Sequence, residues 1–147
     1  MPLKILVVED NLDWELIWKQ IFDVFDKDSE IHWATSADEA HRQIDQLRLR
    51  GIRFDIVVSD IFLLGSSTGL DLLESLDSVY EDRFLFVSSV NGGKLRENLK
   101  ERGIEARVLQ KPFGMQEALR ELQLLRDRNN RSNLAGGGDT LPLTSES

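Results

Sequence analysis

Short apolar runs alternate with amphipathic patterns along most of the chain, and this alternation restricts the possible folds more than any other feature. Leu3 to Val8 is apolar except for Lys4, which is typical of a strand buried on both faces. The other short runs occupy residues 31–34, 54–59, 84–87 and 106–109. The sequence therefore predicts five short strands.

The segments between these runs carry apolar residues at three- and four-residue steps, which is the spacing of an amphipathic helix. After the first run the apolar positions are Trp14, Ile17, Trp18, Ile21 and Phe25. We expect Trp14 and Trp18 to pack in the core or against a partner. Five strands that alternate with five helices predict a doubly wound α/β fold, in which helices cover both faces of a five-stranded parallel sheet.

The alternating pattern covers residues 1–128, which we expect to form one domain. Residues 129–147 are rich in Asn, Gly, Ser and Thr and carry too few apolar side chains to build a core. We expect this segment to be a flexible tail or the stub of a linker.

Composition excludes several classes of protein. With no cysteine, the chain has no disulfide framework, thiolate zinc site or Cys nucleophile. A net charge of −8 argues against direct nucleic-acid binding, and no apolar run approaches the ~18 residues of a membrane span. We expect a cytoplasmic protein with no membrane contact. The acidic excess is compatible with simple solubility or with a cation site built from carboxylates.

Polar side chains follow the expected strands at the points where they end. Glu9 and Asp10 follow the first strand, Asp60 the third, Ser88 the fourth and Lys111 the fifth. Because the carboxyl ends of parallel strands meet at one edge of a sheet, we expect these side chains to lie together. Carboxylates bind Mg²⁺ through oxygen, and a carboxylate can also attack phosphorus to form an acyl phosphate.

Each of these residues also has a purely structural interpretation. Asp10 could cap the following helix, Asp60 could begin a turn, and Ser88 could satisfy a strand end. Lys111 precedes Pro112, a common pair where a strand ends. Their joint position at four strand ends favours a functional site over these separate explanations.

The chain resembles the receiver domains of two-component response regulators. The resemblance spans about residues 2 to 128 and rests on four segments in the family's order and spacing: residues 3–11, 55–60, 84–89 and 109–113. It implies a flavodoxin-like three-layer sandwich and a signalling switch rather than an enzyme with an external substrate.

The resemblance also implies a role for each site residue. Asp60 would accept a phosphoryl group from a histidine kinase or a histidine phosphotransfer protein. Asp10 and Asp60 would bind Mg²⁺ directly, Glu9 through water, and Phe62 through its backbone carbonyl. Lys111 would pair first with Asp60 and then with the phosphoryl group.

Ser88 would hydrogen-bond a phosphoryl oxygen, and its movement would pass the signal to a downstream protein effector. No direct nucleic-acid binding by this chain is implied, so output would come through protein contacts or a module outside it.

Two departures from the family pattern concern the loop after Asp60 and the last strand. Leu64 stands where the family usually has proline, and Gly69 lies one residue further along than usual. Val108 replaces the aromatic residue expected three positions before Lys111. We therefore expect a different conformational readout on the last two strands and the helix between them.

Two alternatives remain open from the sequence. The first, suggested by Val108 and the altered loop, is a receiver-like interaction module that works without phosphorylation. The second is a Mg²⁺-dependent phosphatase with an aspartate nucleophile. Asp60 has no acidic residue two positions further on, as such a phosphatase requires, because Phe62 stands there.

Phe62 and Val90 predict slow self-dephosphorylation. In the family these positions flank the path of the hydrolytic water, and neither apolar side chain can orient a water molecule. The decay of the phosphorylated protein after removal of the phosphodonor measures this. A decay as fast as in the quickest chemotaxis regulators would contradict the prediction.

Overall fold

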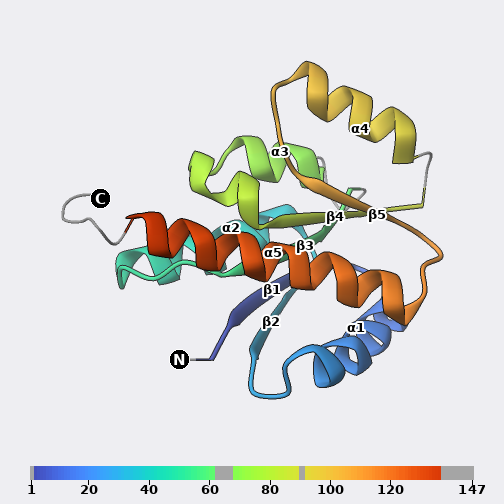
Figure 1. Ribbon diagram of the computed structural model, residues 1–147, viewed down its shortest axis with the longest axis horizontal. Helices are drawn as coiled ribbons and strands as arrows, with labels where there is room; N and C mark the ends of the chain where they lie inside the picture. The colour runs from blue at the N-terminus through green and yellow to red at the C-terminus, as the bar shows by residue number, and fades with distance from the viewer. Residues whose placement is uncertain (1, 62–67, 90–91, 137–147) are drawn as a thin grey trace.

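The computed structural model describes residues 2–61, 68–89 and 92–136 of the 147-residue chain. Five parallel strands form one sheet in the order β2-β1-β3-β4-β5 (Figure 1). They are β1 (Lys4–Val8), β2 (Glu30–Ala34), β3 (Ile56–Asp60), β4 (Phe84–Ser88) and β5 (Arg107–Gln110). This sheet confirms the doubly wound α/β fold that the sequence predicts.

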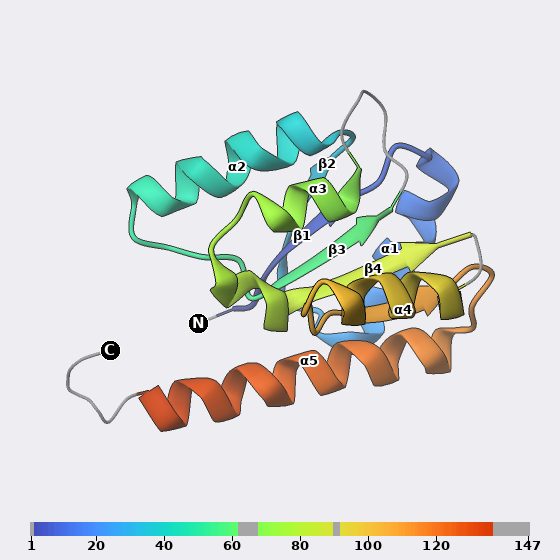
Figure 2. The ribbon, with the colours of Figure 1, turned by 90° about the horizontal axis from the view of Figure 1, so that it is seen from above.

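Helices cover both faces of the sheet and complete three layers (Figure 2). Helices α1 and α5 lie on one face, and α2, α3 and α4 lie on the other. Their bounds are α1 (Leu12–Phe25), α2 (Ala37–Leu49), α3 (Gly69–Glu74), α4 (Gly92–Glu101) and α5 (Met115–Gly136). Among the described residues, no helix is long and apolar enough to cross a membrane.

Alternate side chains of β1 enter two separate cores. Leu6 and Val8 pack in the core beneath α2, α3 and α4. Ile5 and Val7 pack on the opposite face, with Trp18 of α1 and side chains of α5. Because β1 lies between β2 and β3 and its residues 5–8 are buried, its last residues are held by packing on both faces of the sheet.

The chain between β3 and β4 contains two helical segments, where the alternation of strands and helices predicts one helix. Helix α3 ends at Glu74, and a separate 3₁₀ helix, η1 (Ser78–Arg83), follows. The Ser75 hydroxyl donates a hydrogen bond of 2.6 Å to the carbonyl oxygen of Leu72. This local side-chain bond competes with continuation of the helix. The described chain therefore has six helical segments rather than five.

Helix α5 also extends beyond the expected boundary at residue 128. It continues to Gly136, so the first part of the segment 129–147 is helical rather than a flexible tail. The Asn129 side chain is buried and donates a 2.6 Å hydrogen bond to the backbone carbonyl of Asp55. A buried polar contact, rather than apolar periodicity, attaches this part of the helix to the domain. Residues 137–147 lie outside the described residues.

Gly69 begins α3 at a point of close backbone contact with β3. Its N–H donates a 2.8 Å hydrogen bond to the carbonyl oxygen of Ile61. A Cβ atom at this position would lie 2.4 Å from the Asp60 carbonyl oxygen and 2.8 Å from Ser59 Oγ. Only glycine fits here without displacement of the backbone that carries Asp60.

The substitution Gly69→Ala is expected to lower the free energy of unfolding by about 1–3 kcal/mol, because the added methyl group overpacks the end of β3. Chemical denaturation measures this loss. Gly114→Ala is the matched control, since its added Cβ would meet no atom closer than 3.9 Å, and we expect a cost below about 1 kcal/mol there. Equal stabilities of the Gly69→Ala variant and the wild type would contradict the close approach.

Candidate functional site: an acidic pocket at the strand ends

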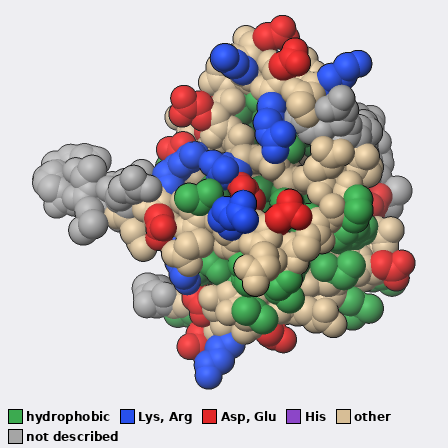
Figure 3. All heavy atoms as spheres, turned by 45° about the vertical axis from the view of Figure 1, so that its right-hand side comes forward, with side chains coloured by type: hydrophobic (Ala, Val, Ile, Leu, Met, Phe, Trp, Pro, Cys, Tyr) green, Lys and Arg blue, Asp and Glu red, His purple; other side chains and the backbone are tan. Residues whose placement is uncertain are grey.

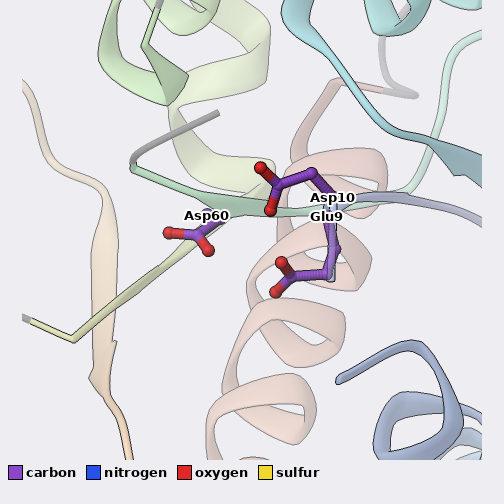
Figure 4. Close-up of side chains that lie close together, drawn as sticks. All are labelled: Glu9, Asp10 and Asp60. Atoms are coloured by element: carbon purple, nitrogen blue, oxygen red, sulfur yellow. The ribbon is translucent and has the colours of Figure 1, made fainter. Parts of the chain in front are cut away.

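Three carboxylates gather at the carboxyl edge of the sheet, as the sequence predicts. Glu9 and Asp10 follow β1, and Asp60 is the last residue of β3 (Figure 4). One carboxylate oxygen from each lies within 4.8 Å of the others. Glu9 and Asp60 are nearly buried, whereas Asp10 is more exposed. Asp10 is therefore the most solvent-accessible of the three carboxylates.

Strand register brings these residues together. Val8 pairs with Ser59 across β1 and β3, so the next residues along each strand lie side by side. The backbone N–H of Glu9 donates a 2.9 Å hydrogen bond to the Ala34 carbonyl oxygen of β2 and extends the sheet by one residue. Glu9 and Asp60 are thus attached to neighbouring strands inside the sheet.

Asn11, not Asp10, caps helix α1. Its side-chain oxygen accepts a 2.9 Å hydrogen bond from the backbone N–H of Asp13. The structural interpretation of Asp10 as a helix cap is therefore wrong. Asp10 is directed instead to the group of carboxylates (Figure 4).

Lys111 provides the positive charge of the site. Its Nζ lies 3.1 Å from Glu9 Oε1 and 3.1 Å from Asp60 Oδ2. These three side chains are 9%, 3% and 11% exposed, respectively, so the two ion pairs are largely shielded from water. When all three carboxylates are ionised, they and Lys111 carry a net charge of −2, which a divalent cation would neutralise.

Burial disfavours the ionised form of the Glu9 carboxyl. Loss of hydration raises the pKa of this carboxyl above its ordinary value, while the Lys111 ammonium opposes the rise through charge and a hydrogen bond. Asp60 adds repulsion that raises the pKa further, and the Asn11 N–H, 3.2 Å from Oε2, lowers it. Desolvation is the largest of these effects, so ionised Glu9 is held at a cost in stability.

Ser88 lies at the end of β4 and is fully buried. Its carbonyl oxygen accepts a 2.7 Å hydrogen bond from the Lys111 N–H, which attaches the Lys111 backbone to the neighbouring strand. The predicted ligand Phe62 lies outside the described residues, as do Leu64 and Val90. Val108 is described and is buried in the core beneath α4.

The sequence did not assign Trp14 to the site, although the structure places it there. Lys111 Nζ lies 4.5 Å from the centre of the Trp14 ring. The sequence feature that could have indicated this is the position of Trp14 in the first turn of the helix that follows Glu9 and Asp10. The hydrophobic periodicity of this helix places Trp14 on its apolar face but gives no indication of a contact with Lys111.

The fold and the site together define a doubly wound α/β domain with an acidic cation pocket at its strand ends. The sequence matches the response regulator receiver domain over residues 5–123. The chain therefore belongs to the family of receiver domains, which are signalling domains of two-component systems. A search of curated protein sequences found no match.

Solved receiver domains share this fold. A CheY-like response regulator receiver domain from Methanospirillum hungatei has 20% sequence identity and a TM-score of 0.72, over 90% of this chain and 99% of that one. The non-phosphorylated HemR receiver domain from Leptospira biflexa has 26% identity and a TM-score of 0.68, over 100% of this chain and 99% of that one. The expected family and fold are confirmed.

Replacement of Glu9 by glutamine is expected to stabilise the metal-free protein at neutral pH. Because the folded pKa of Glu9 is raised, the wild type loses stability as pH rises from the ordinary value of 4.5 through the higher folded value. The Glu9→Gln variant lacks this loss, so its advantage should grow from acidic to neutral pH. Urea unfolding in the presence of a chelator, at several pH values, measures the difference.

Glu97→Gln, which removes an exposed carboxylate on α4, is the control for a general effect of charge. We expect it to change stability little at any of these pH values. A Glu9→Gln variant that is less stable than the wild type at neutral pH would show that the ion pair with Lys111 outweighs desolvation.

Proposed function

We propose that this chain is a phosphoacceptor switch, in which Asp60 receives a phosphoryl group from a phosphohistidine of a kinase or phosphotransfer protein. The observation that carries the proposal is the placement of Lys111 Nζ 3.1 Å from Asp60 and 3.1 Å from Glu9, beside a third carboxylate. A nucleophilic carboxylate, a fixed cation and additional acidic ligands are the parts that phosphoryl transfer to aspartate needs.

Mg²⁺ is the cofactor that this donor set fits best. Oxygen ligands from one or two carboxylates, with open positions for water and phosphate, are typical of Mg²⁺ sites. We propose that Asp10 and Asp60 bind the ion directly, that Glu9 binds it through water, and that the Phe62 carbonyl adds a ligand. The ion would offset the charge that develops on the transferring group.

In the proposed reaction, an Asp60 carboxylate oxygen attacks phosphorus in line with the phosphohistidine nitrogen. A phosphorus–oxygen bond forms, the phosphorus–nitrogen bond breaks, and the released imidazole takes a proton. Lys111 then pairs with the phosphoryl group, and Ser88 donates a hydrogen bond to one of its oxygens. The product is an acyl phosphate that decays slowly, without turnover of an external substrate.

Exposed hydrophobic side chains near the site support a protein as the phosphodonor. In the view of Figure 3, hydrophobic side chains gather on the lower part of the molecule, where α1 and the start of α5 lie. Leu12 and Leu16 of α1 are 72% and 61% exposed, and Met115 at the start of α5 is 38% exposed. An apolar surface of this kind suits protein contact. We propose that phosphorylation changes contacts with a downstream effector in the cytoplasm.

Treatment with Mg²⁺ and a small phosphodonor, or with beryllofluoride, tests the proposal. We expect modification of the wild type at Asp60 that requires Mg²⁺ and is abolished by a chelator. Asp60→Asn should remain folded and unmodified, because its amide cannot act as the nucleophile. Intact-mass analysis and peptide mapping of the phosphorylated protein provide the readout.

Two results would contradict the phosphoacceptor function. A folded wild type that is never modified would favour the interaction module that works without phosphorylation, for which the buried Val108 is the supporting observation. Multiple turnover of phosphoesters would instead favour the Mg²⁺-dependent phosphatase.

A further inference from the structure

A stack of aromatic rings connects helix α1 to the loop that carries Lys111. Phe113, two residues after Lys111, stacks on Trp14 with ring centres 5.1 Å apart. Phe113 also packs against Trp18 at 5.3 Å, and Trp18 packs on Phe22 at 5.5 Å. Trp18 and Phe22 belong to the buried core between the sheet and α1. The position of Trp14 is therefore supported by the loop after β5 as well as by its own helix.

Trp14 touches the site through Lys111. The Lys111 ammonium lies 4.5 Å from the centre of the indole ring and 3.1 Å from oxygens of both Glu9 and Asp60. An ammonium at this distance from an indole face is attracted by the ring, and more strongly when it is shielded from water. The Lys111 side chain is only 9% exposed, so its attraction to the indole ring is stronger than that of a solvent-exposed lysine.

We propose that Trp14 is a positioning residue for Lys111, holding the ammonium beside Asp60 during phosphoryl transfer. The proposal rests on the proposed phosphoacceptor function. The flexible four-carbon stem of a lysine has many rotamers, and the two carboxylates alone do not prevent the ammonium from turning toward solvent. The indole ring closes one side of the site and reduces the number of arrangements that Lys111 can adopt. A positive charge that is already in position accelerates phosphoryl transfer, because the side chain does not have to rearrange as the transition state forms.

The chain contains a matched control in Trp33. Lys19 Nζ lies 5.6 Å from the centre of the Trp33 ring, so this indole also contacts an ammonium. Trp33 is partly buried against the same core as Trp14, but it lies on β2 and its lysine is not part of the acidic pocket. Trp33→Leu therefore removes an indole ring and a longer, more exposed lysine contact away from the site.

The test measures the initial rate of phosphorylation by a small phosphodonor at saturating Mg²⁺. We expect a roughly three- to tenfold lower rate for Trp14→Leu and an intermediate rate for Trp14→Phe, because phenylalanine keeps a weaker ring for the cation. Trp33→Leu should react at the rate of the wild type. In a Lys111→Met background, Trp14→Leu should have no further effect, because the group that it positions is gone.

A second measurement detects the contact itself, without phosphodonor or metal. Protons on the Lys111 carbon next to Nζ lie against the indole face, so their NMR signals should be shifted upfield in the wild type and should return toward ordinary values in Trp14→Phe and further in Trp14→Leu. If the Trp14→Leu variant does not fold, the Trp14→Phe variant is compared with the wild type in both the rate and the NMR measurement.

Equal rates for the wild type and the Trp14 variants, or a loss of rate that persists in full in the Lys111→Met background, would overturn the positioning role. Lys111 signals at ordinary values in the wild type would overturn it as well. A wild type that cannot be phosphorylated at all would instead contradict the proposed function, and the NMR signals would still decide whether Trp14 holds Lys111.

Discussion

The Lys111 ammonium contacts both Glu9 and Asp60, and this allows the two carboxylates to lie close together in a largely buried site. Glu9 and Asp60 are too buried to be stabilised by solvent alone, and each accepts a 3.1 Å contact from Lys111 Nζ. Removal of Lys111 would leave two buried carboxylates without a compensating cation, which is far costlier than the loss of an exposed ion pair. The ends of β1, β3 and β5 are therefore linked by one charge, contributed by a residue about 50 positions away from Asp60 and about 100 from Glu9.

The backbone fixes the positions of these side chains relative to one another. Parallel strands in register deliver three carboxylates to one edge, and the Lys111 backbone is attached to Ser88 across β4 and β5. Gly69 lets the start of α3 approach the Asp60 carbonyl more closely than any other residue could. Burial raises the pKa of Glu9, because loss of hydration disfavours its charged form more than Lys111 favours it. A bound divalent cation, as proposed, would favour the ionised form of Glu9 and so oppose this effect of burial.

Much of the fold and the acidic pocket could be predicted, because hydrophobic periodicity identifies buried strands and the carboxyl ends of parallel strands meet. The remaining features depend on contacts that periodicity does not report. The Ser75 hydroxyl donates a hydrogen bond to the Leu72 carbonyl oxygen where α3 ends, and Asn129 attaches the second half of α5 to the Asp55 carbonyl oxygen. Trp14 had the spacing of a core residue, and only the three-dimensional proximity of α1 to the loop after β5 shows its contact with Lys111.

The central claim is that Glu9, Asp10 and Asp60 form one divalent-cation site balanced by Lys111. Paramagnetic Mn²⁺ takes the same oxygen ligands as Mg²⁺ and broadens NMR signals near the place where it binds. Titration of the isotope-labelled protein with Mn²⁺ should broaden the backbone signals at the ends of β1 and β3 first, and excess Mg²⁺ should restore them. Broadening that begins instead at exposed acidic residues of α1, such as Asp23, or that persists unchanged in an Asp10→Asn variant, would contradict the account.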